Sequence, residues 1–423
     1  MQETTVLKNG LRIITDYIDH VETVSLGVWV GIGARHEEME VNGISHVLEH
    51  MAFKGTEKRS ALEISMAIEN VGGYLNAYTS RESTAYYARI LKEDVPIAVD
   101  IVADILQNSV FSPAELEKEK QVILQEIGQT LDTPDDVIFD YFQETCFPDQ
   151  PIGRSILGPQ ENVLGFTSDQ IHGYMQNHYA TENMVFAAAG KINHDKFVKE
   201  VENGFKNFKE KAVVNNQPAV YKGGNCRFEK PLEQVHLIIG FEGVGIKHVD
   251  YYDQMLLATL LGGGMTSRLF QEIREKRGLV YTISSYINPY IDTGVFGIYA
   301  GTGEDQVKEL MPTVLTEIVR VTNSIKSDEL IRCKTQLKAG LLMGLESTSN
   351  RCERIANQML THGRVIHTEE IEQRIESVTI DAIQSFARKL IETTPTLTSL
   401  GPIKHVLEYD EFISVLGQIK RAG

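Results

Sequence analysis

The chain repeats itself at a spacing of about 214 residues, and this feature constrains its fold more than any other. The segment AELEKEKQVILQEI at 114–127 aligns with DELIRCKTQLKAGL at 328–341, and both have the apolar periodicity of helices. Two further pairs of segments correspond at a similar spacing, 93–109 with 304–321 and 183–195 with 396–406. We therefore expect two similar domains that arose by duplication.

Each half mixes strand patterns with long helical patterns. VETVSLGVWVGIG and STAYYARIL are typical of strands, and they alternate with the helical segments, which predicts an α+β fold with a mostly antiparallel sheet in each half. A polar stretch with Pro218 and two glycines separates the halves. We expect an N-terminal domain at 1–210 with the active site, a linker at 211–230, and a C-terminal repeat domain at 231–423.

Composition narrows the class of protein. The sequence has 423 residues, 42% of them hydrophobic, but no apolar run of about 18 residues and no secretory signal at its start, so we expect a soluble cytoplasmic protein. With 41 basic and 58 acidic residues the net charge is -17, which disfavours nucleic acid and favours a cationic ligand, although solubility alone also explains it. The four scattered cysteines indicate free thiols.

The stretch GISHVLEHMAFKGT at 43–56 places two histidines four residues apart on an amphipathic helix. One face carries the apolar residues Ile44, Val47, Leu48 and Met51. The opposite face carries His46, Glu49 and His50, so the two imidazoles project side by side and can hold one metal ion. The alternative interpretation is a solvated polar face that has no ligand.

A second helix, expected at 113–130, favours the metal site. Its apolar stripe consists of Leu116, Ile123 and Ile127. Glu119 and Glu126 lie on the edge of this stripe, where a carboxylate is costly unless it is paired or bound to metal. The repeat keeps the stripe as Leu330, Leu337 and Leu341. It has Cys333 and Gly340 in place of the two acids, which is the difference expected between a catalytic and a non-catalytic copy.

Two histidines and one glutamate suit a catalytic zinc ion with an open fourth position. We expect His46, His50 and Glu126 to bind one Zn²⁺ per chain; manganese and cobalt accept similar ligands, but these ligand types favour zinc. Zinc lowers the pKa of its water to about 7. Glu49 would take that proton and deliver it to the leaving amine. Glu119 would accept a hydrogen bond from a ligand histidine and fix its tautomer, unless it forms only a surface ion pair.

The motif H-x-x-E-H with a distant glutamate is the inverzincin signature. The chain resembles, over both halves, the mitochondrial-processing-peptidase branch of the pitrilysin/insulinase zinc metallopeptidases, in a bacterial form. GGYLNAYTSRESTAYY at 72–87 and LGGGMTSRLFQEIREKRGLVY at 261–281 are also similar to that family's landmarks. The resemblance implies that His46, His50 and Glu126 are the zinc ligands and that Glu49 is the base.

The resemblance also implies how substrate binds. A peptide adds as a strand to a sheet edge, with Asn76 and Ala77 contacting its backbone, unless YLNAY is an interior strand. Arg274 and Tyr281 match a pair that reaches the substrate carbonyl from the opposing domain, although by spacing alone Arg274 is an ordinary helix-terminal cation. Relatives of this length imply a homodimer that closes as a clamshell over the substrate.

One segment departs from the family pattern. The non-catalytic subunit of the mitochondrial enzyme has a long glycine-rich loop, whereas LLGGGMTSRL is short, so we expect broader cleavage than recognition of presequences. The leading hypothesis is a zinc metalloendopeptidase that hydrolyses unfolded peptides or presequence-like segments, with basic peptides favoured by the charge. The alternatives are a non-catalytic scaffold subunit of the same fold and a catalytic subunit that needs a separate inactive partner.

Overall fold

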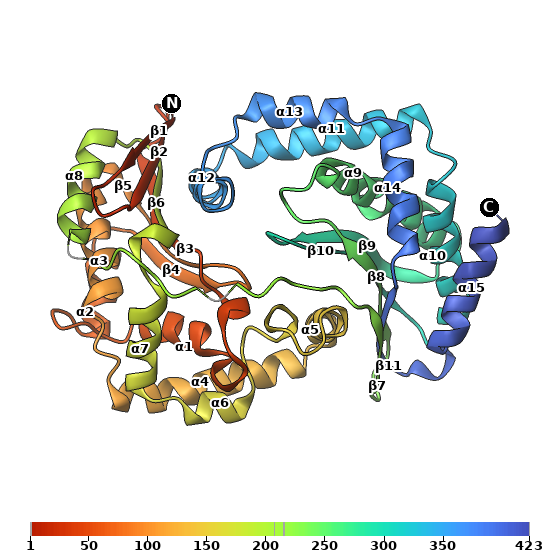
Figure 1. Ribbon diagram of the computed structural model, residues 1–423, viewed down its shortest axis with the longest axis horizontal. Helices are drawn as coiled ribbons and strands as arrows, with labels where there is room; N and C mark the ends of the chain where they lie inside the picture. Colours follow the sequence, from red (N-terminus) through yellow and green to blue (C-terminus); the bar gives the residue numbers. More distant parts are fainter. Residues whose placement is uncertain (1, 207, 215, 423) are drawn as a thin grey trace. The chain divides into compact units, whose positions relative to one another are not determined.

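Two mixed sheets of matching topology organise the chain (Figure 1). The computed structural model describes residues 2–206, 208–214 and 216–422. The first sheet has the order β1-β2-β6-β3-β5-β4, and the second has the order β7-β11-β8-β10-β9. Each contains one parallel pair, β2 with β6 or β7 with β11, and its other pairs are antiparallel. The α+β duplication expected from the sequence is therefore confirmed.

The strands are short and the helices between them vary in length. The first sheet consists of β1 (Gln2–Val6), β2 (Arg12–Tyr17), β3 (Thr23–Val30), β4 (Tyr74–Thr79), β5 (Thr84–Leu91) and β6 (Met184–Gly190). The second consists of β7 (Gly224–Glu229), β8 (Val235–Gly243), β9 (Val280–Pro289), β10 (Gly294–Thr302) and β11 (Thr396–Gly401).

The helices follow the same duplication. In the first half they are α1 (Ile44–Met51), α2 (Ala61–Glu69), α3 (Val95–Gln107), α4 (Pro113–Leu131), α5 (Pro134–Cys146), α6 (Gln160–Gly165), α7 (Ser168–His178) and α8 (His194–Phe205). In the second half they are α9 (Tyr251–Gly262), α10 (Val307–Val321), α11 (Ser327–Gly344), α12 (Thr348–His362), α13 (Thr368–Ser377), α14 (Ile380–Glu392) and α15 (Tyr409–Ala422). None of the described helices is both long enough and apolar enough to cross a membrane.

The chain divides into two units, and each unit includes a helix from the other half of the sequence. The first unit contains residues 1–128, 154–217 and 342–366, and the second contains residues 129–153, 218–341 and 367–423. Helix α12 packs on β6, β3 and β2, whereas α5 packs on β11, β8 and β7. The expected boundaries at 210 and 231 describe two domains that follow each other in the sequence. They therefore miss that α5 belongs to the second unit and α12 to the first.

The expected linker at 211–230 also ends earlier than predicted. The main crossing between units falls inside it, after residue 217, but β7 occupies Gly224–Glu229 and pairs with β11. The side chains of β7 are exposed or only partly buried, because β7 is an edge strand of the second sheet. Such a strand lacks the apolar alternation by which strands are predicted.

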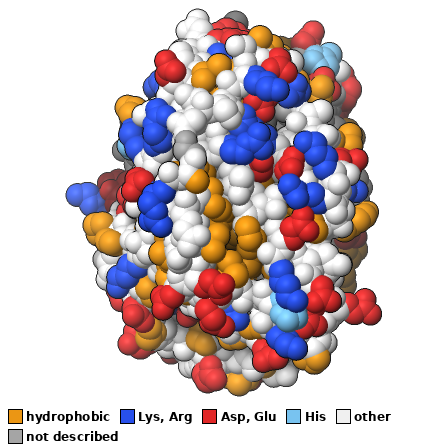
Figure 2. All heavy atoms as spheres, turned by 90° about the vertical axis from the view of Figure 1, so that its right-hand side faces the viewer, with side chains coloured by type: hydrophobic (Ala, Val, Ile, Leu, Met, Phe, Trp, Pro, Cys, Tyr) orange, Lys and Arg blue, Asp and Glu red, His pale blue; other side chains and the backbone are white. Residues whose placement is uncertain are grey.

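The charged side chains on one face of the molecule are mixed in sign (Figure 2). Lys and Arg side chains are interspersed there with Asp and Glu side chains, and hydrophobic side chains gather in a strip near the middle (Figure 2). Nucleic-acid binding depends mainly on neutralising phosphates with clustered basic groups. This face, which is of mixed sign, does not suit such a partner.

Candidate metal centre

Helix α1 is held in place by its apolar face and by a buried glutamate at its start. Val47, Leu48 and Met51 are fully buried in the core of the first unit. Gly43 precedes the helix with a φ of 99°, and a Cβ there would lie 2.8 Å from the Leu157 carbonyl oxygen, so only glycine fits.

The buried carboxylate of Glu37 caps this helix. It accepts hydrogen bonds from the N–H groups of Gly43 at 2.7 Å and Ser45 at 2.8 Å, and from the Asn42 side chain at 2.8 Å. These bonds satisfy donors that are free at a helix N-terminus, and burial raises the pKa of Glu37. Sequence analysis missed Glu37, because a capping acid seven residues before the first residue of the helix follows no local pattern.

The structure brings His46, His50 and Glu126 together. The two histidine Nε2 atoms lie 3.2 Å apart, and Glu126 Oε2 lies 3.5 Å from His46 Nε2 and 3.6 Å from His50 Nε2. Zinc bonds of 2.0–2.2 Å in tetrahedral geometry place neighbouring ligand atoms about 3.3–3.6 Å apart. Their ligand atoms therefore have the spacing that a tetrahedral zinc ion requires.

The environment of His46 suits a metal ligand. Only 6% of its surface is exposed, and burial, together with the nearby His50, lowers its pKa to about 3. The imidazole is therefore neutral at physiological pH, which is the form that binds metal. The Glu126 side chain is 43% exposed, so one side of the cluster is open. Because His46 is buried, the interpretation of this face as a solvated polar surface is wrong.

Glu119 lies beneath His50, on the helix that also carries Glu126. His50 Nδ1 and Glu119 Oε1 are 2.8 Å apart, and because a carboxylate only accepts, Nδ1 carries the proton. The lone pair of His50 is then on Nε2, which faces the cluster. Lys54 Nζ lies 2.6 Å from the other oxygen of Glu119 and balances its charge. Glu119 is buried, so a simple surface ion pair does not describe it; Lys54 was not predicted.

Glu49 is held by a threonine from β4. Thr79 Oγ1 donates a hydrogen bond to Glu49 Oε2 at 2.6 Å. Burial raises the pKa of Glu49, and the Thr79 bond opposes that rise because it favours the charged form. Thr79 follows directly after the YLNAY segment singled out in the sequence, but nothing in the pattern pointed to its hydroxyl.

Replacing Thr79 with valine removes this donor at nearly constant volume. We expect the pKa of Glu49 to rise further, so that the acidic limb of the pH–rate profile moves to higher pH and the rate at neutral pH falls about tenfold. The measurement is the pH dependence of kcat at unchanged zinc content. Thr79→Ser keeps the hydroxyl and should show the wild-type profile. A Thr79→Val variant with the wild-type profile would show that the Thr79 hydroxyl does not set the pKa of Glu49.

Asn76 and Ala77 lie in β4, which is the edge strand of the first sheet and pairs with β5. The alternative interpretation of YLNAY as an interior strand is therefore wrong. The Asn76 Oδ1 atom accepts a hydrogen bond from the Ala77 N–H at 2.9 Å, and β4 contacts α1. The unpaired side of an edge strand can accept a further strand.

Arg274 and Tyr281 belong to the second unit and contact each other. Arg274 lies in a π-helical turn, Phe270–Glu275, and its guanidinium lies 4.6 Å from the ring centre of Phe270 and 5.0 Å from that of Tyr281. Tyr281 is 77% exposed. Single π-helical turns occur frequently at functional sites. The structure thus pairs these two residues within their own unit.

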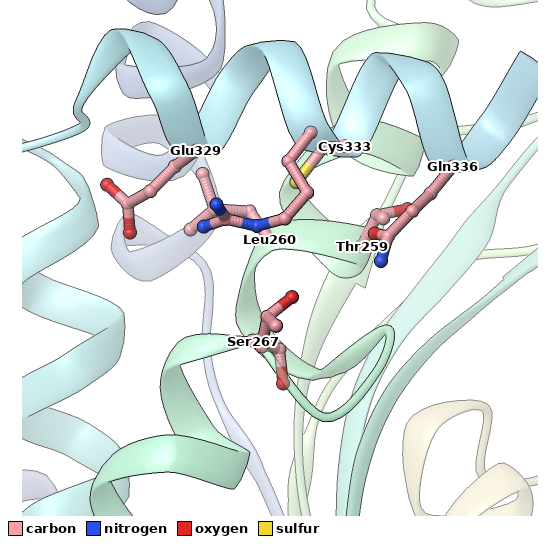
Figure 3. Close-up of a pocket in the computed structure, with 8 residues that line it drawn as sticks. Thr259, Leu260, Ser267, Glu329, Cys333 and Gln336 are labelled. Atoms are coloured by element: carbon pink, nitrogen blue, oxygen red, sulfur yellow. The ribbon is translucent and has the colours of Figure 1, made fainter.

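The repeat of α4 in the second half, α11, carries different chemistry. Figure 3 shows Cys333, Glu329 and Gln336 on α11, opposite Ser267. The pocket that these residues line has a volume of about 10 Å³, which is room for one water molecule at most. Burial raises the pKa of Cys333 to about 11, so its thiol is inert. Glu329 binds Arg268 at 2.8 Å. Among the described residues, His46, His50 and Glu126 are the only group of three suited to a metal ion.

Comparison with known proteins identifies the family of the chain. Residues 12–160 match the insulinase family (peptidase family M16), and residues 165–337 match the peptidase M16 inactive domain. An uncharacterized zinc protease of Rickettsia felis is 42% identical over 94% of this chain and 96% of that protein. A probable mitochondrial-processing peptidase subunit beta of Arabidopsis thaliana is 35% identical, over 96% of this chain and 80% of that protein.

A solved structure shares the fold. The crystal structure of a protease from Helicobacter pylori superposes with a TM-score of 0.89 at 23% identity, covering 95% of this chain and 99% of that one. The matched segments span both halves of the sequence, and the relatives named zinc proteases align along nearly the whole chain. The chain therefore belongs to the insulinase family of peptidases, family M16.

Proposed function

We propose that this chain is a zinc-dependent metalloendopeptidase that hydrolyses unfolded peptides. The observation that carries the proposal is the cluster of His46, His50 and Glu126, at zinc-ligand spacing, with Glu49 on the same helix. Zinc bound by these three residues would polarise a substrate carbonyl and lower the pKa of a water molecule. The zinc protease names of the relatives support the same metal.

The side chains around the cluster have separate tasks in this proposal. Glu49 takes a proton from the attacking water and gives it to the amine of the leaving peptide. Thr79 holds the Glu49 carboxylate, and Glu119 holds the imidazole of His50 with Nε2 toward the cluster. Hydrolysis then requires no covalent intermediate with the chain.

The edge strand β4 supports unfolded peptides as the substrate class. A peptide that pairs with β4 through its main chain gains affinity without a fixed sequence, and only an extended segment can do so. We propose that Asn76 and Ala77, in the middle of β4, contact that backbone. Because β4 contacts α1, a bound peptide would lie near the histidine helix.

We propose that Arg274 and Tyr281 act on the carbonyl oxygen of the substrate. The exposed phenol and the neighbouring guanidinium are both donors suited to a developing negative charge. Tyr281→Phe should lower kcat by about 10²-fold and leave the zinc content unchanged, because it removes one donor and touches no ligand. Steady-state kinetics with a quenched fluorescent peptide measure this effect. An unchanged kcat would exclude Tyr281 from the reaction.

The proposal as a whole is tested by cleavage of a quenched fluorescent peptide with the pure chain. Activity should disappear with a chelator and return when zinc is added after the chelator is removed. If the zinc-loaded chain cuts nothing, it is either one subunit of a two-subunit enzyme or a scaffold protein. Adding an inactive partner subunit distinguishes these two alternatives. Activity that appears only with the partner supports a two-subunit enzyme, and continued inactivity supports a scaffold role.

The assembly is part of the same proposal. We propose that two copies of the chain form the active unit, as the resemblance to the processing-peptidase branch implies. The Arabidopsis relative is named a subunit, so a different partner is the competing assembly. Light scattering on the active pure chain distinguishes a dimer from a monomer.

A further inference from the structure

A second recess lies in the first unit, on the side of the sheet that α12 covers. Its volume is about 220 Å³. Three aromatic side chains from the sheet line it, Trp29, Tyr78 and Tyr87, and α12 contributes Ser349, Cys352 and Glu353. This volume is several times that of one water molecule, so the recess has room for a long side chain.

A chain of hydrogen bonds fixes the wall of this recess. Trp29 Nε1–H donates to the Tyr78 hydroxyl at 3.1 Å, and that hydroxyl donates to Glu353 Oε1 at 2.9 Å. The Tyr78 and Tyr87 rings lie 6.1 Å apart and are tilted by 57°. Glu353 is exposed, and its carboxylate has capacity for further hydrogen bonds. Aromatic faces with a carboxylate at the rim form a site for a cation.

Gly27 permits this arrangement. It lies opposite Tyr87 in the pairing of β3 with β5, and a Cβ added to it would lie 2.7 Å from the Tyr87 Cβ atom. Alternation along β3 places Gly27 on the same face as Ser25 and Trp29, which line the recess. A residue with a side chain at position 27 would therefore displace Tyr87.

The recess adjoins the edge strand on which the proposed substrate binds. Tyr78 belongs to β4 and lies two residues after Asn76, so both side chains lie on the same face of that strand. A peptide strand paired with β4 would turn every second side chain toward this face. One of those side chains can then reach the recess.

We infer that this recess is a specificity subsite for a lysine or arginine side chain of the bound peptide. The inference rests on the proposed peptidase function, and it adds the residues that select among peptides. A cationic side chain would be attracted by the aromatic faces and by the Glu353 carboxylate, whereas an acidic side chain would be repelled by that carboxylate. The net charge of -17 favours the same peptides.

The kinetic test uses pairs of peptides that differ at a single position, where one peptide has arginine and the other has norleucine. A series of such pairs places the varied position at each site along the peptide in turn. At one position the wild-type chain should cleave the arginine peptide with the higher kcat/KM. At that position Glu353→Gln should lower kcat/KM for the arginine peptide about fivefold, and kcat/KM for the norleucine peptide should stay within twofold of the wild-type value. Glu346→Gln, which removes an equally exposed carboxylate just before α12, should change neither. Equal losses for both peptides, or none, would overturn the inference while leaving the peptidase function intact.

A second measurement does not depend on cleavage. Trp29 is the single tryptophan of the chain and lines the recess, so the emission of the protein reports on the surroundings of this one side chain. In the zinc-loaded Glu49→Gln protein, the arginine peptide should shift the emission at a concentration about fivefold lower than the norleucine peptide, and Glu353→Gln should remove that difference. A stronger response to the norleucine peptide would identify an apolar pocket instead, and no response to either would exclude the recess as a subsite.

Discussion

Replacing Glu49 with glutamine is expected to lower kcat by about 10²- to 10⁴-fold, which is the contribution of a positioned general acid–base group. Glutamine keeps the size of the side chain and can still accept a hydrogen bond from Thr79, but it cannot take a proton. Because Glu49 is not one of the three clustered ligands, the zinc content should stay at the wild-type level. The measurements are single-turnover rates and zinc per chain.

The matched control for this variant is Glu69→Gln. Glu69 is exposed at the end of α2 in the same unit, so its replacement changes the net charge equally without touching the cluster. We expect wild-type kinetics from it. A Glu49→Gln protein that retains zinc and full activity would show that another group moves the proton, and it would remove Glu49 from the mechanism.

The residues of the candidate metal centre could be predicted from the sequence because they lie on two regular helices. The apolar residues of α1 and α4 are spaced at the helical period and are buried, so the opposite side of α1 and the edge of α4 could be located in advance. The comparison with Cys333 in the repeat indicated which acids were not needed for packing. Local periodicity thus predicted the helices, and the comparison with the repeat, together with the family resemblance, pointed to the side chains that meet between them.

Other features depend on contacts between distant segments and gave no local signal. The side of the first sheet that carries Trp29 and Ala85 is buried by α12, which contributes Cys352, Ile355 and Met359 from about 270–330 residues later in the chain. The periodicity of α12 predicts a helix but not the sheet that it covers. Lys54, Thr79 and Glu37 are common residue types whose roles follow only from distances in the folded chain.

The cluster also makes metal binding depend on a residue far from the histidines in sequence. Glu126→Ala should lower zinc affinity by more than about 100-fold, because loss of a ligand costs more than loss of a group that only orients one. His50→Ala should have an effect of the same size. The measurement is zinc per chain after dialysis against fixed free zinc, together with the rise in Tm on adding zinc.

The neighbouring helix positions provide the controls. Gln125 is exposed and one residue away on α4, so Gln125→Ala should keep the wild-type affinity. Glu119→Ala should lower the zinc affinity by about 10- to 100-fold, since Glu119 contacts His50 and would orient it but does not lie among the ligand atoms. The loss of zinc affinity is therefore expected to be largest for Glu126→Ala, smaller for Glu119→Ala and absent for Gln125→Ala. This order is specific to a site that includes Glu126 as a ligand. A Glu126→Ala protein that retains zinc with wild-type affinity would break that order and exclude α4 from the metal centre.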